Sequence, residues 1–143
     1  MFVKQISVFL ENKSGSLAGF TRLLGDHGFD LMSLSIADTT DFGILRCIVA
    51  DYKRAQGILT EADYSVKVTD VLAVSVPDRP GALANVLSIL SSHQIGLEYL
   101  YSFFRSQGDH ALIIIRVDKP DEAAGVLRDA GIRMLSQEDL QAV

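Results

Sequence analysis

The chain has little that would cross-link it or place it in a membrane. Its 143 residues include one cysteine, Cys47, which excludes an internal disulfide and the C-x-x-C loop of a metal chaperone. The longest uninterrupted apolar run, residues 111–115, is far shorter than the roughly 20 residues of a membrane-spanning helix. The first residues lack a basic segment followed by a sustained apolar stretch, so they predict a strand and not a signal peptide. We therefore expect a cytoplasmic protein with no membrane partner.

Positive charge is also scarce. The sequence has 13 lysine and arginine residues against 18 aspartate and glutamate residues, which gives a formal net charge of -5. An acidic chain has no general attraction for phosphate backbones, so we expect no nucleic acid partner. Hydrophobic residues make up 48% and charged residues 22%, the balance of a soluble globular protein that is ordered nearly throughout.

The two halves of the sequence resemble one another. Placing ENKSGSLAGFTRLL over PDRPGALANVLSIL aligns Gly15 with Gly81 and Leu17 with Leu83 at an offset of 66. Further along, the apolar positions of a second helical pattern align at an offset of 68. The slip of two residues predicts a longer turn near residues 105–109 in the second half. An internal repeat therefore covers almost the whole chain.

The hydrophobic periodicity changes in the same order within each half. Alternation at the start predicts a strand, and the spacing of Leu17, Phe20 and Leu24 predicts a helix that ends at Gly28. Two further strands, a short helix and a closing strand follow in each half. The predicted later strands are residues 29–37, 43–50 and 64–69, then 95–105, 110–118 and 132–135. This βαββαβ order is typical of the ferredoxin-like α+β fold, with antiparallel sheets and helices on one face.

No linker separates the halves. The sequence YSVKVTDVLAVSVP at the junction lacks a run rich in glycine, proline or serine, so we expect modules at residues 1–69 and 70–143, packed side by side. Each has about 70 residues, close to the size at which a lone core is marginal. Because open module edges offer unpaired strand groups and apolar surface, we also expect a homodimer.

The strand-to-helix turn of the second half has the chemistry of a binding site. Asp78 can accept hydrogen bonds from amides near the helix start, Pro80 suits an early helical position, and Gly81 allows close backbone approach. Free amides at a helix start attract a carboxylate, and Asp78 could hold an ammonium group, which together would suit a zwitterion. The alternative interpretation is that these residues only make a turn and cap the helix.

The residues around this turn resemble a known family. The sequence DRPGALANVLSILSSHQIGLEYL is similar to the opening of an ACT domain, and ENKSGSLAGFTRLLGDHGFDLMSLS resembles the same family in the first half. The chain thus looks like a stand-alone tandem ACT protein. The resemblance implies regulatory binding of amino acids or similar small molecules where the first turn of one module faces the second strand of a neighbouring module.

The candidate ligand-binding residues come from the two turns and two strands. The first turn has Asn12 where the second has Asp78, and Ser14 where the second has Pro80, so the two pockets are not expected to be equivalent. The turn candidates are Asn12, Lys13, Ser14, Gly15, Ser16 and Leu17, and Asp78, Arg79, Pro80, Gly81, Ala82 and Leu83.

The candidates in the strands form the expected pocket walls. Ser33 and Ser35 in the first half correspond to Tyr99 and Tyr101 in the second. Tyrosine walls would favour an aromatic or imidazole group on the ligand. The alternative is that these tyrosines pack between modules or in a dimer interface.

Nothing in the sequence points to a metal, a cofactor or a catalytic centre. His27 and His93 lie at predicted helix ends, where the helix dipole favours a cation, and no nearby spacing resembles a metal site. Cys47 and His110 have no local partner for nucleophilic catalysis. We therefore expect no enzyme activity but regulatory binding of a free amino acid. The alternative is a ligand-free interaction module that regulates an unknown partner enzyme.

Overall fold

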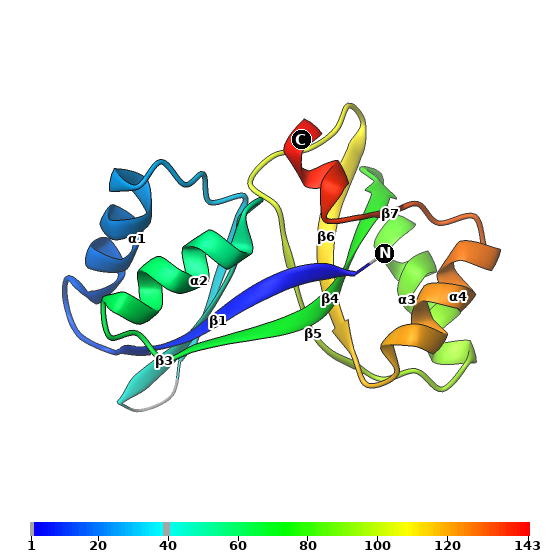
Figure 1. Cartoon of the computed structure of the whole chain (residues 1–143). Helices are drawn as coiled ribbons and strands as arrows, with labels where there is room; N and C mark the ends of the chain where they lie inside the picture. Colours follow the sequence, from blue (N-terminus) through cyan, green and yellow to red (C-terminus); the bar gives the residue numbers. More distant parts are fainter. Residues whose placement is uncertain (1, 39–40) are drawn as a thin grey trace. The chain divides into compact units, whose positions relative to one another are not determined.

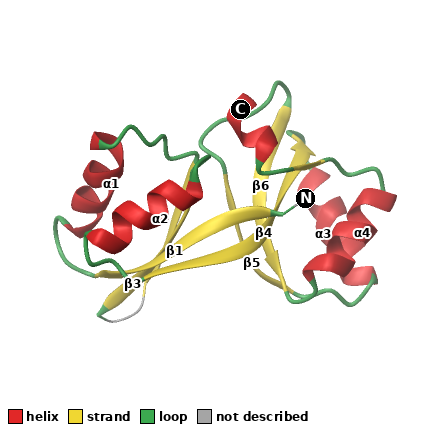
Figure 2. Cartoon of the chain, in the orientation of Figure 1, coloured by secondary structure: helices red, strands yellow, loops and turns green. Residues whose placement is uncertain are grey.

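The computed structural model describes residues 2–38 and 41–143. The chain divides into two units. We call Lys4–Thr69 the first module, and Asp70–Val143 together with Phe2 and Val3 the second module. Figure 1 gives the order of the elements along the chain, and Figure 2 shows the same chain coloured by secondary structure.

The first module has the order βαββαβ. Its elements are β1 (Val3–Glu11), α1 (Ser16–Asp26), β2 (Ser33–Asp38), β3 (Phe42–Ile48), α2 (Tyr52–Glu61) and the start of β4 (Val66–Pro77). Strand β3 lies between β1 and β2 and pairs antiparallel with both. Strand β4 follows β1 in the sheet order.

The core of the first module lies between its sheet and its two helices. The alternation of β1 buries Ile6, Val8 and Leu10 on one face, where they pack with Phe20 of α1 and Leu59 of α2. Figure 1 shows α1 and α2 on one face of these strands. The sequence folds in this way because the strand presents an apolar residue at every second position and the helices at every third or fourth.

The second module repeats this order. It contains the rest of β4, then α3 (Ala82–Ser92), β5 (Leu97–Ser102), β6 (His110–Val117), α4 (Pro120–Asp129), β7 (Met134–Leu135) and the 3-10 helix η1 (Glu138–Ala142). Its strands are ordered β7-β4-β6-β5, and each neighbouring pair is antiparallel. The core packs Leu72 and Val74 of β4 against Val86 and Leu90 of α3 and Leu127 of α4.

Strand pairing confirms the repeat that the sequence predicts. Ser35 lies opposite Arg46 in the first module, as Tyr101 lies opposite Ile114 in the second. The offset is therefore 66 in the strand before the hairpin and 68 in the strand after it. The two additional residues fall between Ser102 and His110, in the connection where the sequence predicts them.

Several element bounds differ from the predicted ones. β3 ends at Ile48 and not at 50, β4 begins at Val66 and not at 64, and β7 begins at Met134 and not at 132. β2 begins at Ser33 and not near residue 29, β5 begins at Leu97 and not at 95, and β5 ends at Ser102 and not at 105. The apolar residues that suggested longer strands are used elsewhere, since Phe29 and Leu31 pack onto the first-module core. Ile95 is likewise part of the second-module core although it precedes the strand.

None of the helices in the described part of the chain is long and apolar enough to span a membrane.

Candidate functional site

The two glycine turns have the same backbone. The amide of Asn12 donates to the carbonyl of Asp41 at 3.0 Å, and the amide of Asp78 donates to the carbonyl of Asp109 at 2.8 Å. Gly15 and Gly81 are the N-caps of α1 and α3, with φ values of 89° and 86°. Positive φ in this range strongly favours glycine, which explains why both turns carry one at this position.

The helix starts after these turns have no side-chain cap. The sequence suggests that Asp78 accepts hydrogen bonds from helix amides, but no side chain caps α3 or α1. Because Gly81 occupies the N-cap, Asp78 lies three residues too early to act as one. Pro80 also precedes the N-cap, so it belongs to the turn and not to the first turn of the helix. The first amides of each helix, which have no acceptor within the helix, are therefore left without a side-chain partner.

A small pocket lies beside the first turn, inside the first module. Its volume is about 90 Å³. It brings together Asn12, Lys13, Ser16 and Leu17 among the predicted residues, whereas Ser14 and Gly15 do not line it. The remaining lining residues are Leu10, Glu11, Ile36 and Gly43.

The residues that sequence reasoning missed in this pocket come from the strands. A side chain at Gly43 would place its Cβ at 3.2 Å from Cγ2 of Ile36, so glycine keeps this part of the pocket open. Strand alternation could have predicted that Ile36 lines this pocket. Ile36 lies opposite Leu45 of the core and therefore points to the helix side of the sheet.

The predicted strand residues point the other way. Ser33 and Ser35 alternate with Leu34 and Ile36, which places them on the sheet face opposite the helices. Ser33 is fully buried and Ser35 is half-buried. Neither serine lines the first-turn pocket of its own module.

The two tyrosines occupy the corresponding face in the second module. The rings of Tyr99 and Tyr101 stack with centroids 6.4 Å apart and an interplanar angle of 23°. Tyr99 is half-buried, and Tyr101 is 9% exposed. The pair forms one aromatic surface on β5, on the face away from α3 and α4.

Charged groups near the turns are mostly exposed. Lys13 Nζ forms an ion pair with Glu11 Oε2 at 3.0 Å. Beside the second turn, the hydrogen bond from His110 lowers the pKa of the Asp109 carboxyl, and the charges of His110 and Arg79 lower it further. The second turn therefore has an imidazole close to its ionised carboxylate, which the first turn does not share because Phe42 corresponds to His110.

The cysteine is unsuited to nucleophilic chemistry. Burial raises the pKa of the Cys47 thiol to about 12, so the thiol stays protonated near neutral pH. Among the described residues, no group of three histidine, cysteine or carboxylate side chains could hold a metal ion.

Each module has antiparallel strands in βαββαβ order and the same glycine turn, so the chain contains a pair of small ferredoxin-like domains. The ACT domain pair family matches residues 1–143. The chain therefore belongs to the ACT domain pair family, as its turn sequences suggest.

Solved structures share this fold. A protein from Bacteroides thetaiotaomicron is 40% identical with a TM-score of 0.92, covering 100% of this chain and 98% of that one. The ligand-free regulatory subunit of aspartate kinase from Thermus thermophilus is 15% identical with a TM-score of 0.61, covering 89% and 91%. The corresponding subunit from Thermus flavus is 16% identical with a TM-score of 0.59, covering 87% and 88%. No curated protein matches the sequence.

Proposed function

We propose that this chain is a regulatory protein that binds a free amino acid and catalyses no reaction. The observation that carries the proposal is the repeated turn, in which a left-handed glycine precedes a helix whose first amides no side chain caps. The family adds support, and the two Thermus structures with the same fold are regulatory subunits of an enzyme.

Each turn offers complementary groups for a zwitterion. The amides at the start of α1 and α3 carry partial positive charge and suit a carboxylate. In the second turn the exposed carboxylate of Asp78 would hold the ammonium group, while Asn12 of the first turn supplies a neutral amide that can donate or accept. We therefore propose a tighter site at residues 78–83 than at residues 12–17.

The size of the first-turn pocket indicates that one module does not enclose the ligand. Its volume of about 90 Å³ is well below the roughly 300 Å³ at which small-molecule pockets begin. The rest of the ligand would need a second module, from this chain or from another copy, and we propose that Ser33, Ser35, Tyr99 and Tyr101 form that wall. The stacked tyrosines would favour an aromatic or imidazole side chain.

Regulation requires more than binding. A ligand shifts an equilibrium only by the difference in its affinity for the two states. We propose that the two states differ in the packing of modules, within the chain or in a homodimer, and that a partner enzyme responds to that difference.

A thermal-shift screen against the common amino acids tests the proposal directly. A ligand that binds only the folded protein adds about 2.7 kcal/mol at 100 times its Kd. We expect one chemical class to raise the Tm in a saturable way. The follow-up measurement is calorimetric titration of that ligand into the variants Gly15→Val and Gly81→Val, which place bulk at the two turns.

The matched control is Gly28→Val. Gly28 also has a left-handed φ of 80°, and a Cβ added there would meet no atom within 4 Å, so this variant carries the same backbone strain away from both turns. We expect Gly81→Val to weaken binding and Gly28→Val to leave it intact. If no amino acid raises the Tm, the ligand-free interaction module becomes the better hypothesis. If an amino acid binds but both variants bind it equally, the proposed site at the second turn is wrong.

A further inference from the structure

A second pocket lies wholly inside the second module and shares no lining residue with the turn candidates at residues 78–83. Its volume is about 410 Å³, within the roughly 300–1,000 Å³ typical of small-molecule sites. Three segments meet there, namely the end of β4, the connection between β5 and β6, and the residues before β7. Its lining residues are Ser75, Pro77, Gln107, His110, Gly131, Ile132 and Arg133.

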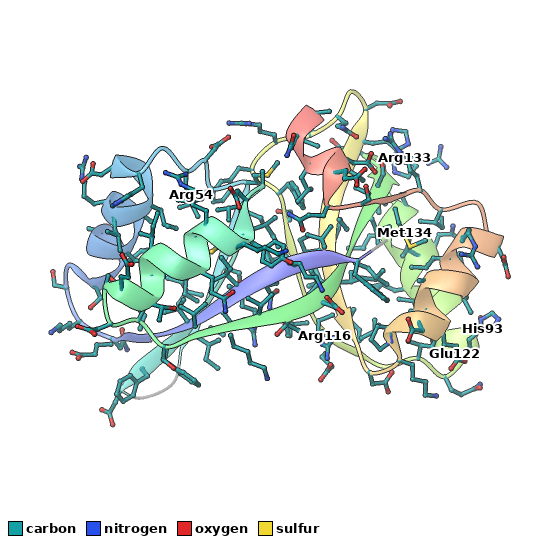
Figure 3. All side chains as sticks on the ribbon, viewed as in Figure 1. Arg54, His93, Arg116, Glu122, Arg133 and Met134 are labelled. Atoms are coloured by element: carbon teal, nitrogen blue, oxygen red, sulfur yellow. The ribbon has the colours of Figure 1, made fainter. Side chains whose placement is uncertain are left out.

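The backbone around this pocket is held in place by hydrogen bonds. The amide of Ser75 donates to the carbonyl of Arg133 at 2.9 Å, which ties β4 to the segment before β7. Gln107 and His110 exchange backbone hydrogen bonds at 3.0 and 2.9 Å, so they close a tight hairpin. The polar side chains therefore project from fixed positions. Figure 3 shows Arg133 beside β7.

The charged groups of the pocket favour an anion. None of the ion pairs in the described part of the chain involves Arg133. His110 Nδ1 donates to Asp109 Oδ1 at 2.8 Å, which leaves Nε2 as an acceptor for a ligand hydroxyl group. Hydrogen bonds from Ser136 lower the pKa of the Asp139 carboxyl, and the charge of Arg133 helps to lower it further. Neither Asp109 nor Asp139 lines the pocket itself.

A buried amide oxygen without a hydrogen-bond partner indicates a second group that the ligand would carry. Among the described residues, Gln107 Oε1 is the buried side-chain atom that has no hydrogen-bond partner. An unsatisfied buried acceptor is unfavourable, and Gln107 lines this pocket, so a donor group on a ligand could satisfy it. A hydroxyl group can both donate and accept, so it satisfies this amide in either orientation.

The first module has no equivalent of this pocket chemistry. By the offsets of the repeat, Phe9 stands where Ser75 does, Glu11 where Pro77 does, and Phe42 where His110 does. Ser65 takes the place of Arg133. The polar set is therefore particular to the second module and is not dictated by the fold.

We propose that this pocket binds a small 2-hydroxy carboxylate. The carboxylate pairs with Arg133, and the hydroxyl bonds to the Gln107 amide and can donate to Nε2 of His110. Pro77 and Ile132 provide an apolar wall for a short hydrocarbon side chain. The site is separate from the proposed amino-acid site and does not depend on the association of modules.

Three ligands that differ only at carbon 2 test this proposal. Calorimetry with the full chain would compare 2-hydroxy-4-methylpentanoate, 4-methylpentanoate and leucine. We expect the hydroxy acid to bind about tenfold or more tightly than the unsubstituted acid, because the latter leaves the Gln107 amide unpaired. Leucine should also bind this pocket more weakly, since its ammonium group meets the Arg133 guanidinium and no lining carboxylate.

Variants separate this pocket from the glycine turn. Arg133→Gln should weaken binding of the hydroxy acid about tenfold or more, whereas Arg128→Gln, on α4 and outside the pocket, should not. Gln107→Leu should abolish the preference for the hydroxy acid over the unsubstituted acid. Gly81→Val should leave hydroxy-acid binding unchanged. A result that contradicts the amino-acid site can therefore be distinguished from a result that contradicts this pocket.

Three results would overturn the proposal. They are no binding of the hydroxy acid at millimolar concentration, equal binding of hydroxy and unsubstituted acids, and equal affinity of Arg133→Gln and Arg128→Gln. Amide chemical shifts of the variants would show that each is folded. In the wild type, shifts induced by the hydroxy acid at Gly131 and at the Gln107 side chain, but not at Gly81, would place the ligand in this pocket.

Discussion

The two modules have the same backbone fold but carry different residues on their surfaces. Their glycine turns, strand pairings and helix starts correspond residue by residue, but one turn carries Asn12 and Ser14 where the other carries Asp78 and Pro80. Phe9 of the first module is 63% exposed, whereas Ser75 at the corresponding position is 7% exposed. The difference shows that the fold preserves the core and turn geometry, while the residues that would contact a ligand vary between copies.

The largest expected effect tests whether the two cores are equivalent. Leu59 and Leu127 correspond in the repeat, and both are fully buried. Replacing either with alanine removes buried methyl groups and leaves a cavity, so we expect each to lower the free energy of unfolding by about 2–5 kcal/mol. Chemical denaturation followed by circular dichroism would measure both, with exposed Leu17→Ala as the control. A cost below about 1 kcal/mol for one of them would show that its module has a looser core.

These core positions are the part of the structure that the sequence predicted best. Helical and strand periodicities report which residues face the core, and burial of such residues is the main driving force of folding. The element order, the repeat and the family assignment could therefore be predicted. The side-by-side packing of the modules, the amino-acid site between them and the homodimer stay predictions.

The sequence predicted the roles and contacts of polar side chains less well, for physical reasons. Aspartate is a residue type that often caps helices. Asp78 does not cap α3, however, because Gly81 occupies the N-cap and two residues separate Asp78 from it. Ser33 and Ser35 lie on the sheet face away from the first-turn pocket of their own module, and their role as a wall for a neighbouring module's turn stays a prediction. The pocket at Arg133 joins residues from three distant segments, and no local sequence pattern indicates such a contact.

A smaller effect distinguishes the second helices of the two modules. Asp51 caps α2 by accepting a hydrogen bond from the amide of Arg54 at 3.2 Å, whereas Lys119, the corresponding residue before α4, makes no side-chain cap. Asp51→Ala should therefore lower the free energy of unfolding by about 1 kcal/mol. Lys119→Ala should change it by less than about 0.5 kcal/mol, because its hydrogen bond to the Gln94 carbonyl is exposed. Denaturation of both variants would check the contrast, and equal losses would contradict it.

The smallest expected effect comes from exchanging residues 12 and 78 between the two turns. This exchange tests whether the difference between the turns has a function. Asn12→Asp gives the first turn the carboxylate of the second, and Asp78→Asn does the reverse. If the carboxylate holds the ligand ammonium, Asn12→Asp should tighten amino-acid binding at the first turn about threefold, since an exposed ion pair contributes up to about 1 kcal/mol. Asp78→Asn should weaken the second site by a similar factor.

Calorimetric titration at low and high salt would measure this exchange, because salt screens an exposed ion pair. We expect the variants to converge as salt rises. The double variant with both exchanges should show the two affinities reversed between the turns, with the total number of sites unchanged. Affinities that follow the turn position and not the carboxylate would show that the surrounding strands, and not residues 12 and 78, set the difference between the modules.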